Sequence, residues 1–323
     1  MTRALRQLLS DRLAPAMPSG RYALIDYPLY NNPGDALIWA GSRQLLETTT
    51  GRAPAYVSTL RGFDPAACRA AIGDGTVFLL GGGNFGHLYE KHHRYRLRAL
   101  RALPGLRVVL LPLTVAPAVP CAALMAETAE ALRIPDQVLA FARDATTRDV
   151  LTGLGLAPVL APDAAHALKL TAPPPVQPLS RLIRQDKESA GGTPRGWDWE
   201  NAPDLRLINR LGKLADRLTP VRRRLTLYDG LAARRIAAAI RRLGAGAQVE
   251  TDRLHGLILA HLIGRPVRIA DNATGKLSAY VAAWGDGLGL LEPPGTFVNA
   301  TSGASCGMAG VCGDLSPDLR GAQ

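Results

Sequence analysis

The chain alternates between short runs of consecutive apolar residues and longer segments of helical periodicity. Apolar runs bounded by turn residues predict buried strands, and the longer periodic segments predict helices. We expect strands at residues 22–27, 76–80, 107–111, 138–143, 157–160, 179–184, 247–250 and 267–270. We expect helices at residues 36–48, 85–103, 204–218, 231–243 and 257–263. Continuously apolar strands that alternate with helices indicate parallel sheets covered on both faces.

A proline-rich break divides this pattern into two α/β regions. The segment 171–178 contains four prolines, a composition typical of linkers. The predicted fold class is therefore α/β, with two doubly wound, Rossmann-like domains that face a cleft. We expect an N-terminal domain over residues 1–172, a linker over 173–178, a C-terminal domain over 179–300 and a flexible Gly/Ala/Ser-rich tail over 301–323.

Composition and charge narrow the function classes. With 323 residues, 47% of them hydrophobic and 20% charged, the chain is long enough for two globular domains. A formal net charge of +11 implies acidic partners. The basic residues are dispersed and aromatic residues make up only 5%, so nucleic acid is not an expected partner.

The length of the apolar segments and the spacing of the cysteines bear on the cellular compartment of the protein. No run reaches the roughly 18 to 20 apolar residues of a membrane-spanning helix. Residues 1–13 carry four charged side chains with no apolar signal core after them, so we expect a cytoplasmic protein. The four cysteines have no CxxC or Cys/His pairing, and we expect neither a disulfide framework nor a metal site.

Polar loops follow several of the predicted strands, where parallel sheets bind their ligands. Three stand out: Asn31–Asp35, Gly81–Gly86 and Arg184–Glu188. Each also has a purely structural interpretation. Asp35 is a suitable helix cap, the glycine turn lacks the Lys-Ser/Thr of a nucleotide-binding loop, and the third loop can form a surface ion-pair cluster.

The segment Thr251–Gly256 is the most informative of these loops. It lies between a predicted strand and a buried helix, an arrangement whose free N–H groups favour an anion. Arg253 adds a forked cation, and His255 adds a group that exchanges protons near neutrality. The alternative is a capped helix in which Asp252 is the N-cap, Arg253 lies on the surface and His255 is enclosed in the core.

Taken in order, the motifs resemble those of the polysaccharide pyruvyl transferase family. They are Asn32-x-Gly34-Asp35, the Gly81–Gly86 turn, Ala142-Arg143-Asp144, Pro162-Asp163, Arg184-x-Asp186-x-Glu188, Thr251–Gly256 and Asp271-Asn272-x-x-Gly275-Lys276 with Trp284. The resemblance spans residues 22–284. It departs from the family pattern at Leu113, where the family commonly has glutamine, so no polar contact is expected from that position.

The resemblance implies a fold similar to the GT-B glycosyltransferases and transfer of a pyruvyl group from phosphoenolpyruvate to a sugar, as a cyclic ketal. No cofactor and no metal are implied beyond this donor substrate. Because the Arg and His of the family's Arg-Leu-His motif contact phosphoenolpyruvate, the same role is implied for Arg253 and His255. His255 is then the expected acid that protonates carbon.

The remaining site residues follow from the needs of this chemistry. Arg253 and Arg184 are candidates for the donor's carboxylate and phosphate, with the backbone N–H of Leu254 beside them. Asp35 and Asn84 are candidates for the sugar hydroxyls, with one of them acting as base, and Asp252 is expected to orient His255 or Arg253. Further candidate substrate contacts are Asn32, Gly34, Gly82, Gly83 and Lys276.

Residues 204–218 predict a basic amphipathic helix. Such a helix can lie on an anionic membrane surface, which suits a lipid-linked acceptor at the inner face of the cell membrane. The alternative is an ordinary helix that packs its leucines into the second domain. The predicted apolar face holds Leu205, Ile208, Leu211, Leu214 and Leu218, and the basic face holds Arg206, Arg210, Lys213 and Arg217, with Arg222, Arg223 and Arg224 close behind.

Two other functions remain open from the sequence. One is a nucleotide-sugar glycosyltransferase of the same architecture, in which the Gly81–Gly86 turn and Arg253 hold a diphosphate. The other is a non-catalytic saccharide-assembly subunit. The acceptor sugar and the oligomeric state are not encoded in any motif that we identify.

Overall fold

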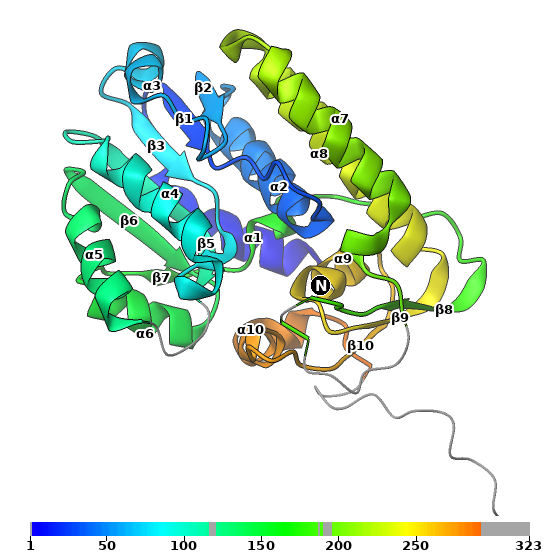
Figure 1. Ribbon diagram of the computed structural model, residues 1–323. Helices are drawn as coiled ribbons and strands as arrows, with labels where there is room; N and C mark the ends of the chain where they lie inside the picture. The colour runs from blue at the N-terminus through cyan, green and yellow to red at the C-terminus, as the bar shows by residue number, and fades with distance from the viewer. Residues whose placement is uncertain (1, 116–120, 187, 190–195, 292–323) are drawn as a thin grey trace, which may run out of the picture.

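The computed structural model describes residues 2–115, 121–186, 188–189 and 196–291. Its first half forms a seven-stranded sheet in which all strands are parallel (Figure 1). The order is β2-β1-β3-β5-β6-β7, with β4 paired to the end of β5. The strands are β1 (Tyr22–Ile25), β2 (Tyr56–Ser58), β3 (Thr76–Leu79), β4 (Gly82–Phe85), β5 (Arg107–Val115), β6 (Gln137–Ala142) and β7 (Val159–Leu160). Because the strand order reverses at β1, the loops after β1 and β3 meet at a switch point.

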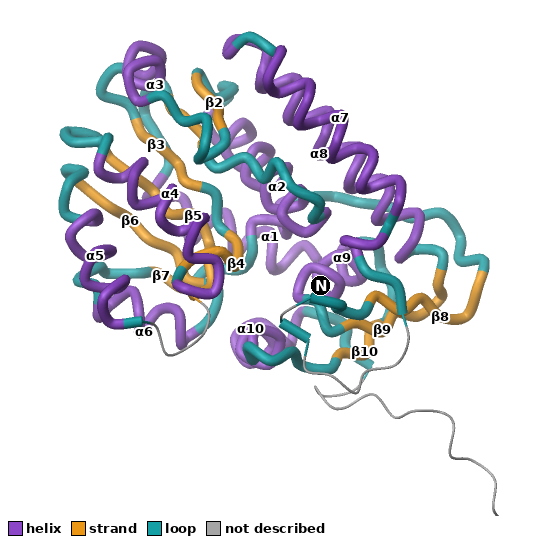
Figure 2. Tube along the Cα trace, in the orientation of Figure 1, coloured by secondary structure: helices purple, strands orange, loops and turns teal. Residues whose placement is uncertain are grey.

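Both faces of this sheet are buried, as the apolar pattern predicts. Alternate residues of β1 enter different clusters: Tyr22 and Leu24 lie in one, Ala23 and Ile25 in the other. Helices α3 (Pro65–Ile72), α4 (Glu90–Arg101), α5 (Ala122–Leu132) and α6 (Ala145–Gly153) contribute to the second cluster. Helices α1 (Thr2–Leu13) and α2 (Pro33–Thr50) contribute to the first. Figure 2 shows these helices on the two sides of the strands.

The second sheet has three parallel strands in the order β10-β9-β8. The strands are β8 (Gln177–Leu182), β9 (Gly246–Thr251) and β10 (Val267–Ile269), and the helices are α7 (Pro203–Leu218), α8 (Arg224–Leu243), α9 (Leu254–Leu262) and α10 (Lys276–Trp284). β9 lies beside β8, and β10 lies beside β9 on the side away from β8, so the strand order follows the chain in one direction. The prediction of a second doubly wound domain is therefore wrong within the described chain, because this sheet has no reversal.

Three predicted boundaries also change. β8 begins at Gln177, inside the expected linker, and Pro178 is tolerated there because β8 is an edge strand. The helix expected from residue 85 begins at Glu90, since β4 continues to Phe85 and Gly86 has a φ of 100°. α9 begins at Leu254, three residues before the predicted start. The expected tail, 301–323, lies outside the described residues.

The two sheets are joined by a common apolar core. The first cluster continues from α1 and α2 into α8, α9 and α10. Tyr27 stacks on Tyr228 with ring centroids 3.9 Å apart, and Trp39 donates to Asp229 at 2.9 Å. The fully buried Arg235 donates to the carbonyl of Pro28 at 2.7 Å. The fold is thus α/β with parallel sheets, but a GT-B-like pair of separate domains is not confirmed.

Candidate active site

The loops at the carboxyl ends of β1, β3, β8 and β9 converge on two overlapping cavities. The larger has a volume of about 430 Å³ and is lined by side chains that include Tyr30, Asn32, Asp35, Arg184 and Arg253. The smaller has a volume of about 60 Å³. Nine of the twelve predicted site residues line the smaller cavity: Asn32, Asp35, Gly83, Asn84, Arg184, Arg253, Leu254, His255 and Lys276. The structure therefore brings these loops together around one cavity.

His255 lies in the first turn of α9 and is held by a buried carboxylate. Its Nε2 lies 3.2 Å from Oδ2 of Asp163, which follows β7 and is fully buried. The same oxygen accepts from Nη1 of Arg143 at 2.5 Å. Burial raises the pKa of Asp163, but His255 and Arg143 outweigh it and hold that pKa well below its usual value. Asp163 is thus ionised and fixes the orientation of the imidazole.

The start of α2 packs directly against this imidazole. Asn32 is the N-cap: its Oδ1 accepts from the N–H of Gly34 at 2.9 Å and its Nδ2 donates to Asp35 at 2.7 Å. A Cβ added to Gly34 would lie 2.6 Å from Cβ, Cγ and Nδ1 of His255. Asn32, not Asp35, therefore caps the helix, and Gly34 makes room for His255.

Replacing Gly34 with alanine is expected to displace His255 or the start of α2. We expect a loss of about 1–3 kcal/mol in the free energy of unfolding, typical of overpacking. The measurement is urea unfolding.

Gly230→Ala is the matched control, since a Cβ there meets nothing within 4 Å and the residue lies inside α8. The control should be neutral or slightly stabilising, because alanine favours a helix. Equal effects of the two substitutions would contradict the close contact between Gly34 and His255.

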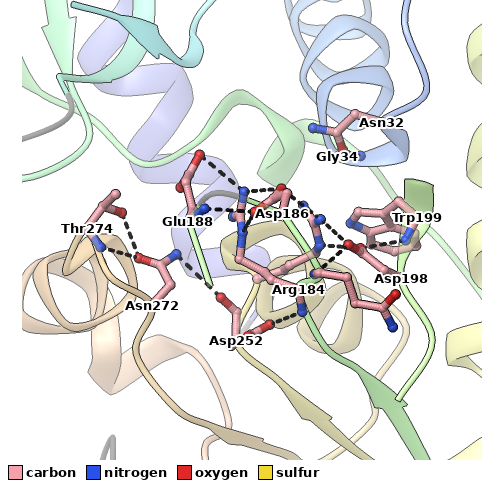
Figure 3. Close-up of polar contacts among 12 residues, drawn as sticks. Asn32, Gly34, Arg184, Asp186, Glu188, Asp198, Trp199, Asp252, Asn272 and Thr274 are labelled. Carbon is pink, nitrogen blue, oxygen red and sulfur yellow. Dashed lines mark hydrogen bonds and ion pairs between the residues drawn. The ribbon is translucent and has the colours of Figure 1, made fainter. Parts of the chain in front are cut away.

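Arg184 lies in a carboxylate cluster (Figure 3), and Arg253 contacts two carboxylates of the same cluster. Arg184 donates through Nε and Nη2 to Asp186, both at 2.8 Å, and its Nη2 lies 3.1 Å from Glu188. Arg253 donates through Nη2 to Asp198 at 2.6 Å and to Asp186 at 3.1 Å. The interpretation of Arg184–Glu188 as an ion-pair cluster is thus confirmed, although the cluster lines the cavity and is not on the open surface.

Each of three arginines keeps one terminal nitrogen that makes no hydrogen bond or ion pair with any other described residue. Within the part of the chain that the structure describes, no hydrogen bond or ion pair engages Nη2 of Arg143 or Nη1 of Arg184 and Arg253. All three side chains line the smaller cavity. The cavity therefore presents guanidinium donors that an anion can engage without displacing the carboxylates.

The carboxylates of this cluster make stability depend on acid pH. Burial raises the pKa of Asp186, but Arg184 and Arg253 outweigh it and lower that pKa to about 2. Asp186 therefore stabilises the fold fully above its ordinary pKa of 3.8, and this contribution is lost as the pH falls through 2.

We expect the free energy of unfolding of the wild-type protein to drop between pH 4 and pH 2. Asp186→Asn should show a smaller drop over that window, because it has no carboxylate to protonate there. Urea unfolding at pH 5, 4, 3 and 2 measures this. Parallel pH profiles for the two proteins would contradict the assignment.

Lys276 and the glycine turn complete the cavity wall. Nζ of Lys276 donates to Glu188 at 3.0 Å, and burial lowers the pKa of this lysine although Glu188 opposes the shift. A Cβ on Gly83 would lie 3.1 Å from that Nζ, and one on Gly82, whose φ is 107°, would lie 3.3 Å from Asp35. The glycines thus make space for neighbouring side chains.

The capped-helix alternative for Thr251–Gly256 is wrong. Arg253 occupies the N-cap position and makes no side-chain cap, while its N–H donates to Thr251 at 3.1 Å. Asp252 instead accepts from the N–H of Arg184 at 2.8 Å, and burial raises its pKa. His255 lines the cavity and is not enclosed in the core.

Several residues of the site were given no role from the sequence alone. Arg143 and Asp163 belong to the motifs Ala142-Arg143-Asp144 and Pro162-Asp163, so the sequence offered a signal from which their pairing could be predicted. Asp198 is fully buried against Arg253 but lies in a segment without periodicity. Among the described residues, no group of His, Cys, Asp and Glu could hold a metal ion.

Another buried carboxylate lies at the end of β1. Asp26 has a φ of 76° and lies 3.0 Å from Nε2 of His92 and 2.9 Å from Nη2 of Arg96. His92 lines the larger cavity together with Tyr30. Burial, together with the charges of Asp35 and Asp26, raises the pKa of Tyr30 well above its usual value, so its hydroxyl stays protonated.

The family model and the named relatives that match this chain are all described as pyruvyl transferases. A family model described as polysaccharide pyruvyl transferase matches residues 32–273. The chain is 27% identical over 310 residues to EpsO of Bacillus subtilis strain 168, named as a candidate pyruvyl transferase, with 88% of this chain and 92% of EpsO covered. It is also 27% identical over 286 residues to pyruvyl transferase 1 of Schizosaccharomyces pombe, with 82% and 69% covered.

A solved structure shares the fold. The crystal structure of a functionally uncharacterised protein from Klebsiella pneumoniae superposes with a TM-score of 0.54 at 18% identity. The match covers 88% of this chain and 94% of that one. At 18% identity this similarity shows a shared fold and nothing more specific.

Proposed function

The chain belongs to the polysaccharide pyruvyl transferase family, and from this premise we propose that it transfers a pyruvyl group from phosphoenolpyruvate to a sugar of a cell-surface or exopolysaccharide precursor. The product is a pyruvate ketal, and phosphate is released. The observation that carries this proposal is one cavity lined by His255 and by three guanidiniums with open donors. The reaction requires no cofactor besides the donor.

The donor carries two anionic groups on a reactive enol. Its carboxylate and phosphate each need charged donors, and Arg143, Arg184 and Arg253 each have a terminal nitrogen open to them. Lys276 adds a fourth cation, and the backbone N–H of Leu254 lies at the start of α9. Because the carboxylate cluster fixes the guanidiniums, the donor binds to a preorganised site.

His255 is the proposed acid of the first step. The methylene carbon of phosphoenolpyruvate accepts a proton, and a sugar hydroxyl attacks the carbon that bears the phosphate. Asp163 stabilises the imidazolium by its charge and holds Nε2, so Nδ1 is the nitrogen left to deliver the proton. Phosphate then leaves, and a second hydroxyl closes the ketal.

The acceptor side is proposed to lie against the first sheet. Asp35, Asn84 and Asn32 line both cavities, and Asp35 is a buried carboxylate able to accept a hydroxyl proton. Asp252 has a positioning role, because it fixes the backbone of Arg184. The larger cavity has room for a sugar ring beside the donor. Phosphoenolpyruvate is a cytoplasmic metabolite, so we propose that the enzyme acts in the cytoplasm.

The test is an incubation of the purified protein with phosphoenolpyruvate and a diol-bearing saccharide. We expect phosphate release that depends on the saccharide, and mass spectrometry of the saccharide should show an added pyruvyl group. Nucleotide sugars serve as the comparison donors. Turnover of a nucleotide sugar in place of phosphoenolpyruvate would indicate a glycosyltransferase, and binding without turnover of any donor would indicate a non-catalytic subunit.

A further inference from the structure

Helix α7 carries a row of exposed leucines along its outer face. Leu207, Leu211, Leu214 and Leu218 are 57%, 54%, 55% and 75% exposed, and Val221 just beyond the helix is 44% exposed. These positions recur at intervals of four, three and four residues, so they lie on one line of a helix with 3.6 residues per turn. The row extends for about 16 Å at 1.5 Å per residue.

The opposite face of α7 holds the helix against the protein. Leu205 is fully buried, Ile208 packs on the shared core, and a Cβ on Gly212 would lie 3.0 Å from Leu231 of α8. The predicted apolar face is therefore divided: Leu205 and Ile208 pack against the protein, whereas Leu211, Leu214 and Leu218 are exposed. The alternative, in which α7 packs its leucines into the second domain, is wrong for these three exposed leucines. Figure 1 shows α7 along the outside of α8.

Unpaired cations flank the leucine row. Five basic residues make no ion pair with any other part of the described chain: Arg210, Lys213, Arg217, Arg222 and Arg223. By contrast, Arg224 next to them lies 3.9 Å from Asp216. A helix with exposed leucines beside these positive charges suits a surface whose outer layer is anionic and whose underlying layer is apolar.

We propose that this outer face of α7 docks on the anionic surface of a lipid bilayer. The leucine row enters the boundary between headgroups and acyl chains, and the five cations contact the lipid phosphates. A second copy of the chain fits this face less well. A stable dimer buries about 800 Å² per partner, more than a single row of leucines offers, and a net charge of +11 opposes self-association.

The same helix connects this surface with the site. Lys213 and Arg217 line a third cavity of about 570 Å³, together with Arg61. Tyr30 and His92 line both this cavity and the 430 Å³ cavity. Docking through α7 would therefore place the third cavity between the bilayer and the catalytic cavity. The docking itself does not depend on the proposed reaction.

The test is flotation of the full chain with vesicles of phosphatidylcholine alone or with 30% phosphatidylglycerol. We expect binding only to the anionic vesicles, weakened by high salt. The double variant Leu211→Glu/Leu214→Glu should reduce the bound fraction at least ten-fold, and the triple variant Arg210→Gln/Arg222→Gln/Arg223→Gln should reduce it and weaken the salt dependence.

Ile134→Glu/Val176→Glu is the matched control, because both residues are exposed and apolar but lie outside α7. It should bind as the wild type does, and circular dichroism should show that all variants are folded. Absence of binding, equal binding to neutral vesicles, or equal loss in the control would overturn the proposal. A dimer detected by light scattering and abolished by the leucine variant would assign the face to a second copy instead.

Discussion

Replacement of His255 with asparagine is expected to lower phosphate release from phosphoenolpyruvate by a factor of about 10² to 10⁴, the usual contribution of a positioned acid. Asparagine retains a polar contact for Asp163 but cannot deliver a proton to carbon. The effect should fall on kcat, with a smaller change in KM, because the arginines that we propose bind the donor are untouched. Steady-state phosphate release measures both constants.

His87→Asn is the matched control. His87 lies in the same half of the molecule as the glycine turn, is partly buried, and accepts from the N–H of Cys121 at 3.2 Å without lining either site cavity. It should retain wild-type kinetics. If His255→Asn kept more than half of the wild-type rate, the acid would have to be another residue.

Replacement of Arg253 with methionine is expected to affect stability and activity together. Asp198 is fully buried and would lose the cation whose Nη2 lies 2.6 Å from it. Leaving one partner of a buried ion pair uncompensated costs about 3–5 kcal/mol in the free energy of unfolding. Donor turnover should also disappear, because one of the open guanidinium donors is removed. Urea unfolding and phosphate release measure the two effects.

A double variant separates these roles. Arg253→Met/Asp198→Asn removes both charges, so it should recover most of the lost stability while remaining inactive. Arg148→Met is the control, since Arg148 forms an exposed pair with Asp149 and should leave the free energy of unfolding unchanged. Recovery of activity in the double variant would show that Arg253 supports the fold and does not bind the donor.

The sequence is sufficient to predict five of the seven strands of the first sheet, all but β2 and β4, and most of the residues that line the smaller cavity. Each parallel sheet collects its strand-end loops at one edge, so Asn32 and Gly83 come together at the first sheet, where they meet Arg184 from the edge of the second. The periodicity also finds α7. It does not show which of its leucines are buried: Leu205 and Leu211 lie on the same predicted apolar face, yet Leu205 is fully buried and Leu211 is 54% exposed.

Other features depend on tertiary contacts that leave no local signal. Asp198 has no periodic neighbours, and its pairing with Arg253 spans 55 positions. Asp26 and His92 meet across 66 positions, and the φ of 76° at Asp26 is unusual for a residue other than glycine. The strands of the second sheet were predicted, but their order in one direction and the apolar core that they share with the first sheet were not, because the apolar pattern of a helix does not show which sheet the helix covers.

The core shared by the two sheets limits how this enzyme can admit its substrates. A hinge motion that separated the sheets would break the stack of Tyr27 on Tyr228, the hydrogen bond from Trp39 to Asp229 and the contact of Gly34 with His255. Such an opening would expose apolar surface from α2 and α8 to water. We therefore expect the proposed donor and acceptor to enter a cavity whose walls are already in place, without the opening and closing of two rigid lobes.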